Sequence, residues 1–363
     1  MPDLTELVGE LVAIDSVNPD LIAGAPGEAE IAELVADWSG AHGLEVQLVG
    51  DATRPSVIAT ARGSGGGRSL LLNGHLDTVG FAGMDAPLTP QVRDGRMYGR
   101  GTYDMKGGLA AILDAAVQAR ERGLRGDVVV TLVADEEVAS IGTESVLERI
   151  RADAAIVVEP TELQLAVAHK GFAGFEVETA GVAAHGSRPH LGVDAIAKMG
   201  PILVALKELD DRLQGGPRHP LLGTASLHAS LIEGGQEFSS YPARCLLTGE
   251  RRTLPGETQA QVEQEVRAVV GDAADVRMLV GRDPFEIDAG HEFVRLVRSC
   301  AEEPEVVGVS YWADSGLIAA AGIPTVLFGP AGEGAHAVEE WVDLASVERV
   351  RDVCLAVACD WCA

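Results

Sequence analysis

The chain has 363 residues, of which 47% are hydrophobic and 23% are charged, a composition typical of a globular protein with a large core. Its 55 acidic and 28 basic residues give a net charge of −27, which disfavours binding to nucleic acids and to anionic membranes. The length predicts two to three domains, and five scattered cysteines are typical of a reducing cytoplasm.

The N-terminal half alternates between strand-like and helix-like segments. A first helix is expected over 4–14. This segment carries acids where a signal peptide has a basic region, so no signal peptide is expected. The sequence has no run of 18 apolar residues, so no transmembrane helix is expected. Further helices are expected over 28–41, 107–122 and 142–150, and strands over 44–49, 56–61, 69–74, 127–133 and 154–158. This alternation predicts a largely parallel sheet covered on both faces. The GSGGG segment at 63–67 is expected to be a hairpin turn.

The pattern changes near residue 172. Strands are expected at 174–181, 225–234 and 244–252, with helices at 192–213 and 257–271. After about 285 the earlier pattern returns, with a helix at 290–301, a buried strand at 320–330 and a last helix from 344. The sequence therefore predicts one α/β domain, residues 1–171 and 285–363, interrupted by an α+β domain of residues 172–284.

Five segments end an apolar run or a Gly-rich turn with side chains that can bind a metal. They are LLLNGHLD with His75 and Asp77, GRGTYDMKGG with Asp104, VVVTLVADEE with Asp135, Glu136 and Glu137, AAIVVEP with Glu159, and FGPAGEGAH with His336. Each segment alone also fits a solvated loop. Because ligands collect at the carboxyl ends of parallel strands, these positions can converge. Two histidines and three acids are a donor set that zinc, cobalt or manganese accepts.

These motifs resemble those of the co-catalytic zinc peptidase and deacylase family of acetylornithine deacetylase, succinyl-diaminopimelate desuccinylase and glutamate carboxypeptidase. The resemblance rests on HLD at 75–77, GRGxxDMKGG at 99–108, DEE at 135–137, EPT at 159–161 and the late His336. It covers essentially the whole chain in the same order. It implies a three-layer α/β/α catalytic domain and an inserted ferredoxin-like lid and dimerisation domain.

The resemblance also implies the ligands of two divalent cations, with zinc preferred over cobalt or manganese. Asp104 would bridge the two cations. His75 and Glu159 would complete the first site, and Glu137 and His336 would complete the second.

Two neighbouring acids receive other roles from the resemblance. Glu136 would stay free of metal and act as general base on a metal-bridging water. Asp77 would orient His75 from outside the ligand set, and Asp135 is expected to be only a polar neighbour.

Substrate contacts are expected mainly from the inserted domain. His185 resembles a lid histidine that stabilises the oxyanion in the partner subunit's site, although a surface loop residue would fit the same pattern. Arg252 would bind the substrate carboxylate, and Ser239 stands where many relatives have asparagine. Gly329 would donate its N–H to a substrate carboxylate, and Lys170 would make a substrate or structural contact.

The sequence therefore predicts a cytoplasmic, homodimeric hydrolase that deacylates N-acyl amino acids as acetylornithine deacetylase does. A dipeptidase or carboxypeptidase with the same metal site is the alternative within this chemistry. A metal-binding scaffold without activity is a more remote alternative, because every ligand position and Glu136 are present. Neither a nucleic acid nor a membrane is expected as a partner. No redox or zinc role is assigned to Cys359 and Cys362, because no supporting ligand pair is visible.

Overall fold

A computed structural model describes residues 3–363, which divide into two compact units. Unit 1 contains the chain up to Val167 together with Ile287–Val307 and Ala313–Ala363, and unit 2 contains Ala168–Glu286 and Gly308–Trp312. No helix in the described part of the chain is long and apolar enough to cross a membrane.

Unit 1 is built on a mixed sheet that runs through the strands in the order β1-β2-β6-β3-β7-β15-β8. In that order the strands are β1 (Glu45–Asp51), β2 (Arg54–Ala61), β6 (Val128–Val133), β3 (Leu70–His75), β7 (Ala154–Val157), β15 (Thr325–Leu327) and β8 (Leu165–His169). The order continues to β13 (Phe285–Glu286), and β14 (Val306–Val309) also pairs with β8. A smaller sheet joins β16 (Gly332–Glu333), β17 (Trp341–Asp343), β5 (Arg96–Tyr98) and β4 (Gln91–Arg93).

The predicted α/β fold is confirmed, but the expectation of a largely parallel sheet is wrong. Only the centre is parallel, where β3 pairs with β6 and β7, and β7 pairs with β15. The pairs β1–β2, β2–β6 and β15–β8 are antiparallel. The chain between the paired residues Asp51 and Arg54 is too short for the crossover that a parallel pair requires.

The predicted hairpin at the GSGGG segment is also wrong, because β6 lies between β2 and β3. The N–H of Ser64 donates to the carbonyl of Leu124, so the Gly-rich loop lies alongside the turn that precedes β6. A Cβ at Gly126 in that turn would lie 1.7 Å from the carbonyl oxygen of Arg68. The glycines therefore serve a close backbone approach between two loops.

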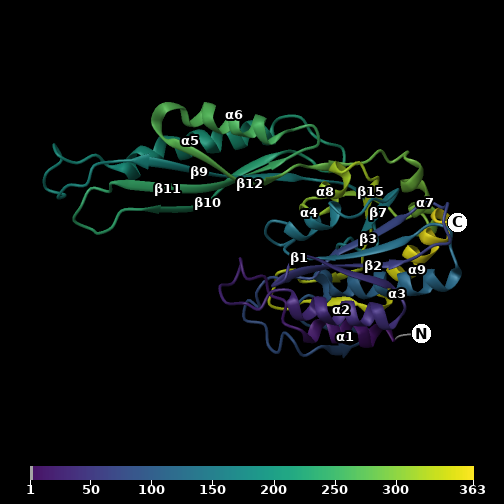
Figure 1. Ribbon diagram of the computed structural model, residues 1–363. Helices are drawn as coiled ribbons and strands as arrows, with labels where there is room; N and C mark the ends of the chain where they lie inside the picture. Colours follow the sequence, from purple (N-terminus) through teal and green to yellow (C-terminus); the bar gives the residue numbers. More distant parts are fainter. Residues whose placement is uncertain (1–2) are drawn as a thin grey trace. The chain divides into compact units, whose positions relative to one another are not determined.

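Helices cover both faces of the sheet of unit 1. They are α1 (Leu4–Ala13), α2 (Ala29–Ala41), α3 (Gly107–Arg122), α4 (Ile141–Leu147), α7 (Glu292–Cys300), α8 (Ser315–Ala320) and α9 (Leu344–Trp361). Figure 1 shows α1, α2, α3 and α9 on one side of the sheet and α4 and α8 on the other. The strand predicted over 320–330 is shorter than expected. The helix α8 extends to Ala320, and Gly322, with φ of +85°, makes the turn into β15.

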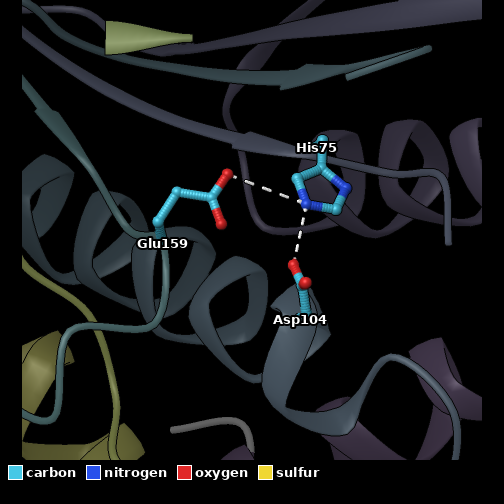
Figure 2. A group of neighbouring side chains, drawn as sticks. All are labelled: His75, Asp104 and Glu159. Carbon is cyan, nitrogen blue, oxygen red and sulfur yellow. Dashed lines mark hydrogen bonds and ion pairs between the residues drawn. The ribbon is translucent and has the colours of Figure 1, made fainter. Parts of the chain in front are cut away.

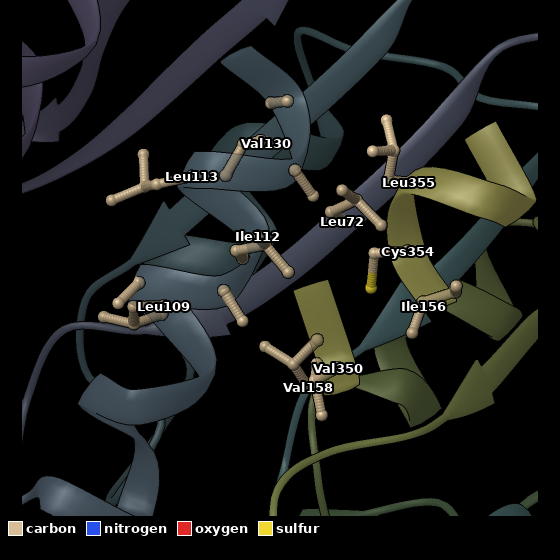
Figure 3. Packing of buried hydrophobic residues seen from close by; sticks show 14 of the residues in the cluster. Leu72, Leu109, Ile112, Leu113, Val130, Ile156, Val158, Val350, Cys354 and Leu355 are labelled. Atoms are coloured by element: carbon tan, nitrogen blue, oxygen red, sulfur yellow. The ribbon is translucent and has the colours of Figure 1, made fainter. Parts of the chain in front are cut away.

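The core of unit 1 holds α3 against the centre of the sheet. Leu109 and Ile112 of α3 and Cys354 of α9 are fully buried with Leu72 of β3 and Val130 of β6 (Figure 3). Each such aliphatic side chain contributes about 1.5–3 kcal/mol when it is fully buried. This packing fixes the start of α3, which the five-residue helical turn η1 (Thr102–Lys106) directly precedes.

Unit 2 is an antiparallel sheet in the order β10-β11-β9-β12 with two helices packed against it. Its elements are β9 (Gly171–Ala180), α5 (Ala195–Gln214), β10 (Ser226–Gly234), β11 (Arg244–Thr253), α6 (Gln259–Val270), the short helix η2 (Gly271–Ala273) and β12 (Asp275–Arg282). Alternate residues of β9 are buried, so Phe175 and Val177 form a core with Met199 of α5 and Val266 of α6. Thr258 begins α6 with a capping box.

Candidate metal centre

The parallel strands of unit 1 end in the side chains of the candidate metal centre. His75 is the last residue of β3, Glu137 follows β6 by four residues and Glu159 follows β7 by two. Asp104 lies in η1, just before α3. Gly108 allows the start of α3 to pack close to the end of β7, since a Cβ at this position would lie 2.6 Å from the carbonyl oxygen of Val158. These chain segments therefore meet at the carboxyl edge of the sheet.

A first group of three side chains could hold a metal ion: His75, Asp104 and Glu159. His75 Nε2 lies 3.1 Å from Asp104 Oδ1 and 3.7 Å from Glu159 Oε1 (Figure 2). His75 and Glu159 are buried, so this group is shielded from solvent. The structure thus brings together the three residues predicted for the first cation.

A second group shares Asp104 with the first and adds Glu137 and His336. His336 Nε2 lies 3.2 Å from Glu137 Oε2 and 3.4 Å from Asp104 Oδ2. Asp104 therefore presents one carboxylate oxygen to each group. The other oxygen of Glu137, Oε1, is buried without a hydrogen-bond partner. Asp104, with one oxygen toward each group, fits the predicted bridging position.

The acids of this centre are crowded. Burial raises the pKa values of Glu136, Glu137 and Glu159, and the charges of neighbouring carboxylates raise them further. Glu136 and Glu137 are consecutive in the chain, so their repulsion cannot be relieved by moving the segments apart. Divalent cations stabilise such a cluster by neutralising it, and these donors are the oxygen and nitrogen ligands that zinc accepts.

The histidines respond to the same acids. Burial lowers the pKa of His75, but the charge of Glu159 and the hydrogen bond to Asp104 outweigh burial and raise it well above 6.5. Hydrogen bonds to Asp104 and Glu137 raise the pKa of His336 to about 10. Both imidazoles therefore lie in a negative field that also attracts cations.

Glu136 belongs to neither ligand group among the described residues. Its side chain is half-buried, and its N–H donates to Asp77 Oδ1 at 3.1 Å. This hydrogen bond fixes the backbone of Glu136 next to Glu137, a residue of the second ligand group.

Asp77 holds His75 differently from the expectation. His75 Nδ1 lies 2.9 Å from the main-chain carbonyl oxygen of Asp77 and 3.6 Å from its carboxylate. The carboxylate instead accepts the N–H groups of Glu136 and Glu137 and the amide of Asn18. Asp77 thus orients the imidazole and fixes the backbone of the two consecutive glutamates.

A buried network behind Asp77 was not predicted from the sequence. Asn18 Nδ2 donates to Asp77 at 2.8 Å and to Asp135 at 3.0 Å. Arg54 lies 2.9 Å from Asp135 Oδ1 and forms a two-point contact with the buried Glu28. Asp135 is therefore more than a polar neighbour. Its position after an apolar strand was the only sequence signal, because its partners are distant in the chain.

Gly329 does not have the predicted free N–H. That group already donates to Thr161 Oγ1 at 2.9 Å. A Cβ at Gly329 would lie 2.0 Å from the carbonyl oxygen of Glu159, so glycine is required by the close approach of the two segments. The expected donation from Gly329 to a substrate is therefore corrected to a packing role.

The remaining predicted residues belong to unit 2, where His185 and Ser239 lie on neighbouring loops. His185 forms a bridge with Ser240, and the N–H of Gly186 donates to the carbonyl of Ser239 at 2.6 Å. The imidazole of His185 is exposed and its Nδ1 lies 2.8 Å from Ser187 Oγ.

The predicted substrate-binding arginine already has a carboxylate partner. Arg252 Nε donates to Glu250 Oε1 at 2.5 Å, and its Nη2 lies 3.3 Å from Glu250 Oε2. Lys170 donates to the main-chain carbonyl of Thr224 at 2.7 Å, which is a structural contact.

Comparison with known proteins agrees with this geometry. The family described as "Peptidase family M20/M25/M40" matches residues 71–360. An acetylornithine deacetylase of Proteus mirabilis is 30% identical over 371 residues, which cover 97% of this chain and 95% of that protein. The metallo-carboxypeptidase Sso-CP2 of Sulfolobus solfataricus has a similar fold, with a TM-score of 0.82, 18% identity and 99% of each chain covered. Bacillus subtilis YXEP, described as a dinuclear metal binding peptidase, has a TM-score of 0.73 and 17% identity, with 99% of this chain and 97% of that chain covered.

Proposed function

The chain belongs to peptidase family M20/M25/M40, and on this premise we propose that it deacylates N-acyl amino acids with the help of two divalent cations. Membership of the family makes the chain a hydrolase of amide bonds. The observation that carries the finer proposal is the pair of ligand groups that share Asp104. The preference for an N-acyl amino acid is supported by the similarity to an acetylornithine deacetylase along the whole chain.

In this proposal each ligand group holds one cation. His75, Asp104 and Glu159 would hold the first, and Asp104, Glu137 and His336 the second. Zinc is the proposed metal, and cobalt or manganese would accept the same oxygen and nitrogen donors. Bound cations supply Lewis acidity, which polarises an amide carbonyl and acidifies water.

Glu136 is the proposed general base. It would accept a proton from the attacking water and deliver it to the departing amine. Its place outside both ligand groups supports this role, since a carboxylate that binds no cation keeps its oxygens for a proton. Asp77 would keep Glu136 in place through the hydrogen bond to its N–H.

Unit 2 is proposed as the lid and dimerisation domain. His185 would stabilise the oxyanion of a partner subunit's site, and Ser239 beside it would contact substrate. Arg252 would bind the substrate carboxylate by exchanging its present partner, Glu250. The edge strand β10 exposes apolar side chains, which supports pairing with a second copy of the chain. Five free thiols support a cytoplasmic location.

A dipeptidase or carboxypeptidase is the second candidate, because the similar solved structures are described as peptidases. The two are separated by incubating the protein with N-acetyl and N-succinyl amino acids and with dipeptides, and measuring the released amine. Turnover of acyl amino acids that chelation abolishes is the expected result. Turnover of dipeptides alone would contradict the deacylase proposal, and turnover of neither class, with no bound cation, would leave the non-catalytic scaffold.

A further inference from the structure

A buried ion pair joins the turn that carries Asp104 to the loop that carries His336. Arg100 Nη1 donates to Glu340 Oε2 at 2.6 Å, and the two side chains are each only 1% exposed. Neither residue belongs to a ligand group. Neither of them has a predicted role.

Glu340 fixes the backbone of the Asp104 turn. Its Oε2 also accepts the N–H of Gly101 at 3.0 Å, and its Oε1 accepts the N–H groups of Tyr103 at 2.9 Å and Asp104 at 3.1 Å. The main-chain carbonyl of Glu340 accepts the N–H of Gly99 at 3.2 Å. One residue thus holds four N–H groups of the turn that presents Asp104.

Arg100 extends this hold to the His336 loop. Its Nη2 donates to the carbonyl oxygen of Ala337, the residue after His336, at 2.8 Å. The His336 side chain is 55% exposed, so packing around the ring does little to fix it. The position of the imidazole therefore depends on the backbone of its loop, which Arg100 and Glu340 tie to the Asp104 turn.

We infer that Glu340 is a positioning residue that sets the separation of Asp104 and His336, and with it the cation affinity of the second ligand group. The inference rests on the proposed two-cation function. Residues that orient metal ligands without touching the metal change affinity by about 10- to 100-fold when they are replaced. The first group is less sensitive, because it does not contain His336 and because its other two ligands lie at the ends of strands β3 and β7.

The substitution Glu340→Gln tests this inference with little change in shape. Each carboxylate oxygen of Glu340 accepts two donors, so an amide nitrogen would face two donors in either orientation. The variant also leaves Arg100 without its charged partner. Glu339→Gln is the matched control, because it makes the same chemical change at the adjacent, exposed position.

The measurement is calorimetric titration of zinc into chelator-treated full-length protein, with circular dichroism as the check on folding. E340Q is expected to bind one of two cations about 10- to 100-fold more weakly and the other within about threefold of its normal affinity. E339Q is expected to match the unsubstituted protein. His336→Ala identifies the affected binding event, and adding E340Q to it should change the remaining event by less than about threefold.

Arg100→Lys keeps the test decisive if E340Q does not fold. Lysine retains the charge opposite Glu340 but cannot also reach the carbonyl of Ala337, so the same binding event should weaken by at least about threefold. If E340Q binds both cations as tightly as E339Q does, the positioning role alone is overturned. An equal loss of affinity at both sites would overturn it as well. Where E340Q does not fold, R100K takes its place in both comparisons. An unsubstituted protein that binds no cation would overturn the proposed function and this inference together.

Discussion

Replacing Glu136 with glutamine should separate proton transfer from metal binding. Glutamine has nearly the shape of glutamate, and the N–H of residue 136 would still donate to Asp77. Because Glu136 lies in neither ligand group, the charges of the ligands themselves are unchanged. The loss that bears on turnover is the capacity to take a proton.

The size of the effect follows from that single loss. General base catalysis contributes about 10²- to 10⁴-fold, so kcat should fall by that factor, which corresponds to about 3–5 kcal/mol of transition-state stabilisation. KM should stay within about threefold, since no substrate contact is removed. Glu148→Gln, an exposed position after the next helix, is the control and should leave kcat unchanged.

The assay combines steady-state deacylation with metal analysis of the same dialysed samples. Two cations retained with the predicted loss of kcat would support the assignment of the two consecutive glutamates. If E136Q loses a cation while Glu137→Gln keeps both, the roles of Glu136 and Glu137 are reversed and the reasoning is refuted.

Further predictions concern other parts of the chain. His185→Ala should lower kcat without unfolding, and mixing it with E136Q should restore part of the activity, which a monomer would not show. Arg54→Met leaves two buried acids without their cation and should lower the free energy of unfolding, measured in urea, by about 3–5 kcal/mol; a loss below 1 kcal/mol would contradict the network. Gly329→Ala should cost about 1–3 kcal/mol of stability, because its Cβ would meet the carbonyl oxygen of Glu159.

The segments that hold the candidate ligands could be predicted because each one ends an apolar strand or a Gly-rich turn, and the resemblance to the family selected the ligands within them. Their convergence can be expected without knowing which strands are adjacent, since the carboxyl ends of parallel strands lie at the same edge of the sheet. His75 and Glu159 illustrate this: His75 is the last residue of the buried strand β3, and Glu159 follows the buried strand β7 by two residues. The packing of the α/β layers follows from the same local patterns.

The sheet order and the supporting contacts could not be predicted in the same way. Local periodicity predicts that β2, β3 and β6 are strands, but it does not reveal that β6 pairs with both of the others. Glu340 reaches the Asp104 turn only because β17 pairs with β5, two strands far apart in the chain and too short to give a pattern. Likewise, the salt bridge that occupies Arg252 comes from a side chain two residues away, which spacing alone does not identify.

The most direct test of the two-cation centre is a crystal structure of the zinc-loaded protein with anomalous scattering measured on both sides of the zinc absorption edge. The account predicts two zinc peaks in each chain, with Asp104 bound to both, His75 and Glu159 on one, and Glu137 and His336 on the other. A single peak, or zinc bound away from Asp104, would contradict it.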